Sequence, residues 1–584
     1  MSRPYTLGTS VIVASLACVI APAVHAQNNP CDQPGEFPDV IVGSLYQASA
    51  YGSNGSFSAY SVGTYSCNIG TCWLDWIAGD NRHPVIGQNM FRLKDGRFEQ
   101  IGQSWLKHGF TALDDEVCST GCIPTDGTHL GVNCADPYSA FLNGQQNNLG
   151  PKFEVNANKG TFPFPATNQG QTGNNVFKRL QVPTADVDPA QNSGARYFVE
   201  GQYVTLDDAA AGKQDNNASW REVTVTPASI SFPAGSTTHR TEPGIAAWRA
   251  FDPTVQLNAV RVPNEGLLHL ASKVTDVSQP GDPQWRYEYA LQNLNSHRSI
   301  RSFSIPLAQG VTVTNVGFHD VHYHSGEPWD NTDWTPTVTT SSVTWSGPTF
   351  AENPQGNALR WGTLYNFRFE ADVPPAPGDV TLQPFFPGTP TSFTAPTQVP
   401  LCDGDFDGDG LCNFLDVDDD NDGVDDLDDS DPLDQHVCRD LDGDTCDDCS
   451  SGTSDPANDG TDTDTDGICD LGDCAPTTPG QDPPGPVDNT LLLSIEVDAV
   501  QLGWSTGAGS ETSSVYAGTI SGEWSYNETC VASGIAGETW DDTATTPPDT
   551  TTYYLIGASN GCGESRIGLD SEGNEVYPTT PCNP

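Results

Sequence analysis

An aspartate-rich stretch constrains this chain more than any other feature of its sequence. Between Asp403 and Asp473 there are 27 aspartates, no glutamate and a single Lys or Arg, Arg439. Such a stretch has almost no apolar surface to bury and cannot fold around a hydrophobic core. It is either a solvated acidic linker, extended by its own charge repulsion, or a set of loops that cations hold together. The spacing of the aspartates distinguishes the two.

The aspartates stand at alternate positions in four groups, which begin at Asp405, Asp418, Asp440 and Asp462. Glycine follows the third aspartate in every group except the third, where Thr445 takes its place. Ca²⁺ takes about six to eight oxygen ligands, and a glycine lets the backbone turn sharply around the ion. With the first aspartate of a group as position 1, position 7 can offer a carbonyl, and positions 9 and 12 carry side-chain oxygens.

This register predicts several bound calcium ions, and the third site is expected to be weaker because of Thr445 and Ser451. The predicted calcium ligands are Asp405, Asp407, Asp409, Asn413 and Asp416; Asp418, Asp420, Asp422, Asp426 and Asp429; Asp440, Asp442, Asp444 and Asp448; and Asp462, Asp464, Asp466, Asp470 and Asp473.

Cysteines are threaded through these groups, whose starts lie 13, 22 and 22 residues apart. The cysteines are Cys402, Cys412, Cys438, Cys446, Cys449, Cys469 and Cys474. Residues 402–474 thereby resemble the thrombospondin type 3 repeat. The resemblance implies Asp-rich loops that wrap calcium along a disulfide-pinned segment with little regular secondary structure. It implies calcium-dependent rigidity, and no catalysis.

Residues 1–26 are typical of a secretory signal peptide. Arg3 precedes an apolar run, and Val24-His25-Ala26 supplies small residues for cleavage. No segment reaches the length of a membrane span, so we expect a secreted or cell-surface protein. Without Cys18, 16 of the 17 cysteines remain, which favours disulfides in an oxidising compartment. The net charge of −52 excludes nucleic acid and anionic lipid as direct partners, because both would be repelled.

Period-two alternation and frequent Gly and Pro turns predict a mostly β, multidomain fold of β-sandwich modules joined by the calcium-binding segment. We expect a signal peptide (1–26), a β-rich domain with disulfides (27–250), a β-sandwich (251–400), the calcium-binding repeats (401–485) and a small β-sandwich (486–584). Residues 90–101 predict a hairpin with its turn at Asp95-Gly96. Residues 374–400 predict a last strand that runs into a linker.

The final domain loosely resembles a fibronectin type III-like sandwich. The residues that carry this resemblance are Leu502-Gly503-Trp504, Tyr516 and Thr552 to Ile556. The resemblance implies a spacer or binding module. Cys530 and Cys562 are expected to pair there, and Cys582 elsewhere. The six cysteines between residues 27 and 135 allow 15 pairings, which the sequence leaves open.

One stretch indicates different chemistry. On a strand, Asp320, His322 and His324 would share a face and could hold one transition metal ion, such as zinc, copper or iron. Histidines near a strand end are more often hydrogen-bonded surface residues. Ser104 lies four residues before His108, but the sequence does not show whether the two meet.

The sequence therefore favours a binding role over catalysis. We expect a calcium-binding protein of adhesion or extracellular-matrix interaction, whose further partner is an unidentified extracellular protein or polysaccharide. The alternative is a secreted metalloenzyme, oxidative or hydrolytic, with its site in residues 27–400.

Overall fold

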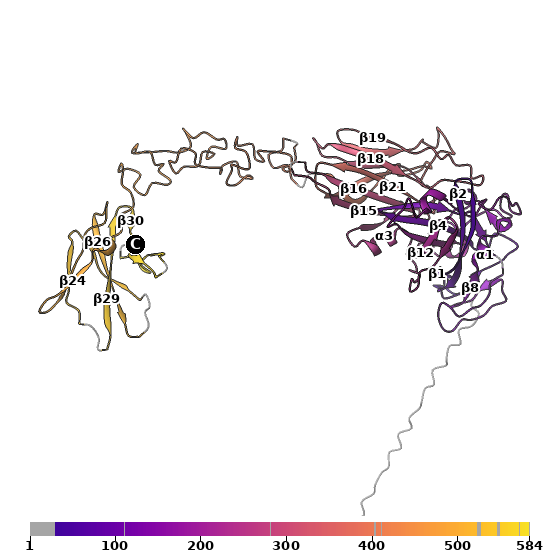
Figure 1. Ribbon diagram of the computed structural model, residues 1–584, viewed down its shortest axis with the longest axis horizontal. Coiled ribbons are helices and arrows are strands. Elements are labelled where there is room, and N and C mark those ends of the chain that lie inside the picture. The colour runs from indigo at the N-terminus through magenta and orange to yellow at the C-terminus, as the bar shows by residue number, and fades with distance from the viewer. Residues whose placement is uncertain are drawn as a thin grey trace, which may run out of the picture. The chain divides into compact units, whose positions relative to one another are not determined.

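The computed structural model describes residues 30–109, 111–280, 282–401, 404–409, 411–522, 527–545, 549–571 and 573–582. The predicted signal peptide lies outside these residues. The described chain is mostly β, with short helices, and divides into two compact units at residue 403 (Figure 1). The prediction of a mostly β, multidomain fold is confirmed.

The first unit begins with an eleven-stranded sheet in which neighbouring strands are antiparallel. Its main path is β1 (Val40–Asn54), β2 (Phe57–Asn68), β10 (Leu180–Pro183), β5 (Arg97–Gln103), β4 (Val85–Lys94), β11 (Arg196–Val204), β12 (Ala218–Thr226) and β13 (Ser229–Ser231), and β6 (Leu106–His108), β8 (Ala135–Tyr138) and β9 (Leu149–Gly150) pair off this path. A separate pair joins β3 (Leu74–Asp75) to β7 (His129–Leu130).

The predicted hairpin is confirmed as β4 and β5. Asp95 and Gly96 form its turn with φ of 52° and 80°. Two consecutive left-handed residues give the turn twist that antiparallel strands require, which is why an Asp-Gly pair stands here.

Two five-stranded sheets follow in the same unit. The first is β14 (Gln256–Arg261), β15 (Leu267–Asp276), β16 (Trp285–Asn293), β21 (Thr363–Ala371) and β18 (Val313–His319); the second is β19 (Thr335–Val338), β20 (Ser342–Ser346), β17 (Ile300–Pro306), β22 (Ala376–Pro384) and β23 (Phe393–Val399). Phe303 of β17 lies 4.4 Å from Phe367 of β21 between ring centroids, so aromatic side chains of the two sheets pack on each other as in a β-sandwich.

The stretch 374–400 contains two strands, β22 and β23, instead of the single strand and linker that its prolines indicated. Pro396 lies on the edge strand β23. Pro377 lies on β22 outside the part that pairs with β17. Pro384 is the last residue of β22 and stands opposite Ile300 at the end of the pairing with β17, so these prolines lie on the edge strand or near the ends of β22.

Residues 30–401 share an apolar cluster across residue 250. Phe91, Phe98 and Phe198 of the first sheet pack with Ala290 and Leu364 of the sandwich. Short helices cover the connections: α1 (Ala140–Asn143), α2 (Leu206–Ala210), α3 (Ala246–Phe251), and the 3-10 turns η1 (Gln146–Asn148), η2 (Lys152–Glu154) and η3 (Thr184–Val187).

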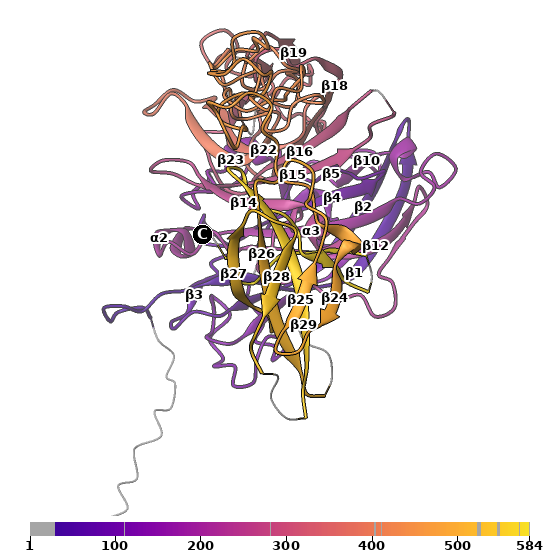
Figure 2. The ribbon, with the colours of Figure 1, turned by 90° about the vertical axis from the view of Figure 1, so that its left-hand side faces the viewer.

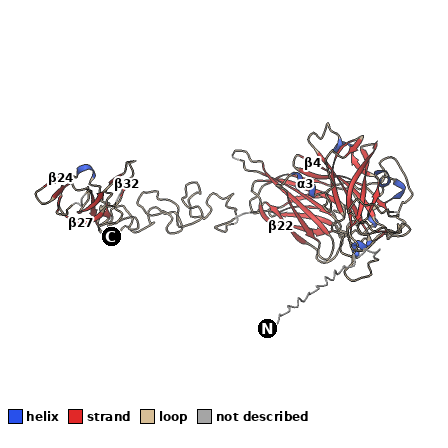
Figure 3. Ribbon diagram, turned by 90° about the horizontal axis from the view of Figure 1, so that it is seen from below, coloured by secondary structure: helices blue, strands red, loops and turns tan. Residues whose placement is uncertain are grey.

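The second unit begins with residues 404–485, which form loops and turns without helix or strand among the described residues (Figure 3). After η4 (Asp488–Thr490) come the strands of the C-terminal domain (Figure 2). They form a three-stranded sheet of β24 (Leu492–Ile495), β25 (Val500–Gly503) and β28 (Thr539–Asp542), a four-stranded sheet of β27 (Thr529–Ile535), β26 (Thr512–Ile520), β29 (Thr551–Asn560) and β30 (Gly563–Glu564), and the pair β31 (Gly568–Leu569) and β32 (Glu575–Val576). Leu502, Trp504, Val515 and Ile556 are buried between them.

Seven disulfides are present in the described residues: Cys31–Cys72, Cys67–Cys118, Cys122–Cys134, Cys438–Cys449, Cys446–Cys469, Cys474–Cys562 and Cys530–Cys582. The expected Cys530–Cys562 bond is wrong. Cys562, just beyond β29, instead reaches back to the end of the Asp-rich segment, and Cys530 of β27 pairs with the chain terminus.

Candidate metal sites

The four Asp-rich groups form loops of the same structure. We name them loop 1 (405–416), loop 2 (418–429), loop 3 (440–451) and loop 4 (462–473). In each, the side chain at position 9 accepts a hydrogen bond from the backbone N–H at position 2. These bonds are Phe406 N to Asn413 Oδ1 (3.1 Å), Asp419 N to Asp426 Oδ1 (2.9 Å), Leu441 N to Asp448 Oδ1 (3.2 Å) and Thr463 N to Asp470 Oδ1 (2.7 Å).

The position-5 carboxylates repeat a second bond, in which one oxygen accepts the N–H of position 7. The pairs are Leu411 N to Asp409 (2.7 Å), Val424 N to Asp422 (2.8 Å), Cys446 N to Asp444 (2.9 Å) and Ile468 N to Asp466 (3.0 Å). Each of these carboxylates therefore accepts a hydrogen bond from the backbone of its own loop. A random acidic tract would not repeat both bonds four times.

Left-handed backbone recurs at two positions of the loops. Position 4 has positive φ in all four, at Gly408 (76°), Asn421 (58°), Gly443 (80°) and Thr465 (64°). Position 6 has it at Gly423 (94°), Thr445 (78°) and Gly467 (91°), whereas Gly410 lies outside the described residues. The sequence indicated the turn at position 6 and missed the turn at position 4, where Asn and Thr stand among the glycines.

Loop 2 has the strongest features of a cation site. One carboxylate oxygen each of Asp418, Asp420 and Asp422 is buried without a hydrogen-bond partner in the protein. The carboxylates offer ligand atoms within 4.8 Å of one another. Asp420 is 4% exposed and Asp422 is fully buried. Leaving such oxygens unpaired costs free energy, and a hard cation is the group that their chemistry fits.

The pKa values of two carboxyl groups in loop 2 are raised, as expected where negative charges are crowded without a cation. Burial, followed by the charge of Asp422, raises the pKa of Asp420 to about 6. Burial, followed by the charge of Asp426, raises the pKa of Asp419 to about 6. Arg439 lies 3.8 Å from Asp448 in loop 3, so the one Lys or Arg of the segment pairs elsewhere.

The other loops differ in detail. Asp405, Asp407 and Asp409 of loop 1 also bring their ligand atoms within 4.8 Å of one another. In loop 3 the corresponding group is Asp440, Asp442 and Asp448, with the position-9 carboxylate in place of Asp444. In loop 4 both oxygens of Asp464 are buried without a partner.

At position 12, Asp416, Asp429 and Asp473 accept N–H groups of the next one or two residues. Ser451 instead donates to the carbonyl of Thr453. Sequence reasoning missed Asp459, which is 8% exposed and has an unpartnered oxygen. It stands outside every loop register, so no spacing signal could have found it.

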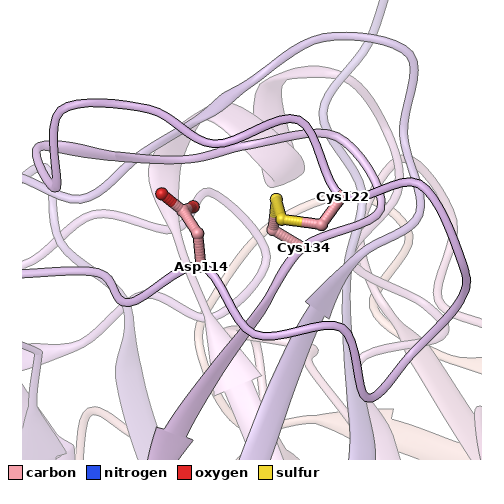
Figure 4. Close-up of side chains that lie close together, drawn as sticks. All are labelled: Asp114, Cys122 and Cys134. Atoms are coloured by element: carbon pink, nitrogen blue, oxygen red, sulfur yellow. A yellow bond between two sulfur atoms is a disulfide. The ribbon is translucent and has the colours of Figure 1, made fainter.

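Two groups of candidate ligands contain cystines. Asp422 lies with Cys438 and Cys449, and Asp114 lies with Cys122 and Cys134 (Figure 4). In both groups the sulfurs are bonded to each other. Metals bind thiolates, so these sulfurs are not ligands. Beside loop 2, the cystine packs with Val424 into a small buried cluster.

Asp320, His322 and His324 were predicted to share a face of one strand, which required the strand to continue to His324. β18 stops at His319, so the three residues do not share a strand face. Their segment instead bonds the first sheet: His324 Nε2 donates to the Gln103 carbonyl (2.8 Å), and its Nδ1 lies 2.9 Å from Ser325 Oγ. The Asp320 carboxylate accepts from Asn357.

A metal at His324 would have to displace one of these bonds. Burial lowers the pKa of His324 to about 4, so the ring is neutral. All three residues line one pocket with His319, and the transition-metal site stays a prediction.

Ser104 and His108 form hydrogen bonds with different partners. Ser104 Oγ donates to the Trp105 carbonyl (2.7 Å), and His108 Nδ1 lies 2.9 Å from His83 Nε2. Because each side chain bonds a different partner, this pair does not have the arrangement of a nucleophile and its base.

No family model matches the sequence, and no curated protein matches it. Among solved structures, the B domain of a biofilm-associated protein is 12% identical, covering 67% of this chain and 94% of that chain, with a TM-score of 0.13. The N-terminal domain of a Streptococcus gordonii adhesin is 9% identical, covering 63% and 98%, with a TM-score of 0.14. Similarities at these TM-scores carry no argument. None of the helices in the described residues has the length and apolar character needed to cross a membrane.

Proposed function

We propose that this chain is an exported calcium-binding protein of the cell surface or extracellular space, active in adhesion or matrix interaction. Its Asp-rich segment, with the thrombospondin type 3-like spacing, is a spacer that calcium stiffens. The supporting observation is the set of buried, unpartnered carboxylate oxygens in loop 2, inside a loop structure that repeats four times. Seven disulfides fit an oxidising compartment.

Calcium replaces the missing core in this proposal. Bound to a loop, the ion neutralises carboxylates that otherwise repel one another. Two hydrogen bonds within the loop then hold its shape. The position-9 side chain closes the loop through the position-2 amide, and the position-5 carboxylate is oriented by the position-7 amide. Extracellular modules of this kind bind at about 10⁻⁴–10⁻³ M Ca²⁺.

Calorimetric titration of the full chain after dialysis against EDTA tests the proposal. We expect several sites in the submillimolar to millimolar range, and Asp420→Asn/Asp422→Asn should remove about one. Asp425→Asn/Asp428→Asn is the matched control, because it removes the same charge from exposed aspartates of the same segment. Equal titrations for both variants, or no heat at millimolar Ca²⁺, would falsify the calcium proposal.

A pocket in the first unit supports the adhesive part of the proposal. Its cavity volume is about 40 Å³, and it is lined by Lys152, Phe153, Val155, His297, Ser299, Tyr323, Trp329, Arg360, Trp361 and Phe386. Arg360 is 5% exposed and its guanidinium stacks 3.7 Å from the Trp329 ring centroid. Aromatic faces such as that of Trp329 suit the sugar rings of a polysaccharide.

Binding of the full chain to immobilised acidic and neutral polysaccharides tests this part. We expect retention on the neutral one, because the net charge of −52 repels the acidic one, and Trp329→Ala should weaken this retention several-fold. Val338→Ala, at an exposed apolar position on β19, is the control and should leave retention unchanged. If the wild type binds neither polysaccharide, a protein partner becomes the better account.

A further inference from the structure

A row of buried polar side chains crosses the first sheet. Asn89 on β4 lies directly opposite Gln103 on β5 and Glu200 on β11. They are 2%, 3% and 0% exposed. Residues directly opposite in an antiparallel sheet project to the same face, so the three side chains form one group. Nothing in the calcium proposal uses them.

Lys152 of η2 brings its amine to this row. Its Nζ lies 3.3 Å from Asn89 Oδ1, 3.1 Å from Gln103 Oε1 and 3.3 Å from the Gly362 carbonyl. The side chain is buried, with the residue 6% exposed. These three partners are neutral oxygens, and burial lowers the pKa of Lys152 to about 8. A buried lysine of this kind gives up its proton readily and becomes a nucleophile.

Glu200 touches the amide nitrogen of Asn89. Its Oε1 accepts from Asn89 Nδ2 at 2.7 Å, and its Oε2 accepts from Gln292 Nε2 at 2.8 Å. Burial raises the pKa of Glu200. Transfer of a proton from Lys152 to Glu200 would leave two neutral groups, which a buried site favours over an ion pair. The carboxyl group then stands beside the nitrogen that leaves in an amide exchange.

We propose that Lys152 and Asn89 form an intramolecular amide cross-link, with Glu200 as the catalytic acid and base. The neutral Nζ attacks Cγ of Asn89, the Nζ–Cγ bond forms, and the Cγ–Nδ2 bond breaks. Glu200 carries a proton from Nζ to Nδ2, which leaves as ammonia. The products are one amide and one ammonia, and no oxidant or cofactor takes part.

The geometry selects Asn89 over Gln103 as the reacting amide. Gln103 Nε2 donates to the His322 carbonyl at 2.9 Å, so its nitrogen contacts no acid that could protonate it as a leaving group. The cross-link joins residues 63 apart, from β4 to η2. It closes a segment that already contains the Cys122–Cys134 bond, and, unlike that bond, it resists reducing agents.

Mass spectrometry of the full chain tests the proposal. After reduction, alkylation and protease digestion, we expect one branched peptide that joins the Asn89 and Lys152 peptides. It is lighter than their sum by one ammonia, about 17 Da. Recovery of both peptides as separate linear species, with Asn89 and Lys152 intact, overturns the proposal. A branch from Lys152 to Gln103 overturns it as well.

Two variants separate the roles of the side chains. Glu200→Gln keeps the shape and removes the acid, so the branched peptide should be lost. Glu116→Gln removes the same charge at an exposed position and is the control, so the branched peptide should remain. If Glu200→Gln fails to fold, the wild-type map still decides whether the bond exists. A folded Glu200→Gln chain with an intact branch overturns the role of Glu200.

Discussion

Thr445 stands where loops 2 and 4 carry Gly423 and Gly467, and its backbone has a φ of 78°. A β-branched residue pays about 1–2 kcal/mol for the left-handed region, which glycine enters freely. Loop 3 nevertheless keeps the bond from the position-6 N–H to the position-1 carboxylate, from Thr445 N to Asp440 at 3.0 Å. The fold therefore holds Thr445 in a left-handed backbone conformation that a β-branched residue disfavours.

Replacing Thr445 by glycine should therefore tighten calcium binding at loop 3. We expect a gain of about 1 kcal/mol, about fivefold in Kd, because the closed loop no longer strains the backbone. Calorimetry of the full chain would show the weakest site strengthen. Thr461→Gly, at an exposed position without positive φ, is the control and should bring no gain. A gain from both substitutions would point to loop flexibility as the cause.

The buried carboxyl group of Asp208 makes the stability of the first unit depend on pH. It is fully buried and accepts hydrogen bonds from Val40 N and Asn217 Nδ2, both at 2.9 Å. Burial, reinforced by the charges of Asp39 and Asp207, raises its pKa from 3.8 to about 8. Between these two values the folded state holds a proton that the unfolded state has lost. Stability is therefore present in acid and lost as the pH rises through this window.

Chemical unfolding at pH 5 and pH 7.5 should show this loss. The slope from this one group approaches about 1.4 kcal/mol per pH unit, and Asp208→Asn should reduce it. Asp379→Asn, at an exposed position on β22, is the control and should leave the slope unchanged. A wild-type chain more stable at pH 7.5 than at pH 5 would contradict the assignment.

Elements whose signal is local agree with the structure. The hairpin of β4 and β5 follows from two turn residues, and β29 contains the stretch Thr552 to Ile556 that the sequence assigned to the C-terminal sandwich. Elements that depend on distant contacts do not. β18 ends at His319 because the residues that follow bond Gln103 of the other sheet. Residues 374–400 form two strands because β17 offers β22 an edge.

The hairpin turn gives an element-scale prediction. Gly96→Ala should lower the stability of the first unit by about 1 kcal/mol, because alanine is strained at a φ of 80°. Gly79→Ala is the control, since Gly79 has no positive φ and a Cβ there meets no atom within 4 Å. Thermal unfolding of the two variants gives the comparison. Equal midpoints would mean that the turn relaxes.

At the scale of the whole molecule, two kinds of stabilisation coexist in one chain. Residues 30–401 bury apolar clusters such as Tyr60, Ile86, Met90 and Val199. Residues 404–474 rely on cystines and on carboxylates that lack counter-charges. Removal of a cation should therefore affect the second region and spare the first.

Hydrogen exchange of the full chain with Ca²⁺ or with EDTA should separate the two regions. We expect amides of residues 404–474 to lose protection in EDTA, because the carboxylates then repel one another. Amides of β4, β5 and β16 should be unaffected, since the hydrophobic core needs no ion. Uniform loss across both regions would show that calcium stabilises the first unit too.

The sequence by itself determined the register of the Asp-rich loops. Every contact that closes a loop lies within nine consecutive residues, so spacing along the chain is almost the geometry itself. Only the folded structure establishes the disulfide partners, the contact of Lys152 with Asn89 and the contact of Asn89 with Glu200. Those residues are 41 or more positions apart, except within Cys122–Cys134, Cys438–Cys449 and Cys446–Cys469. Tertiary contacts bring them together, and no periodicity in one segment records which other segment will lie beside it.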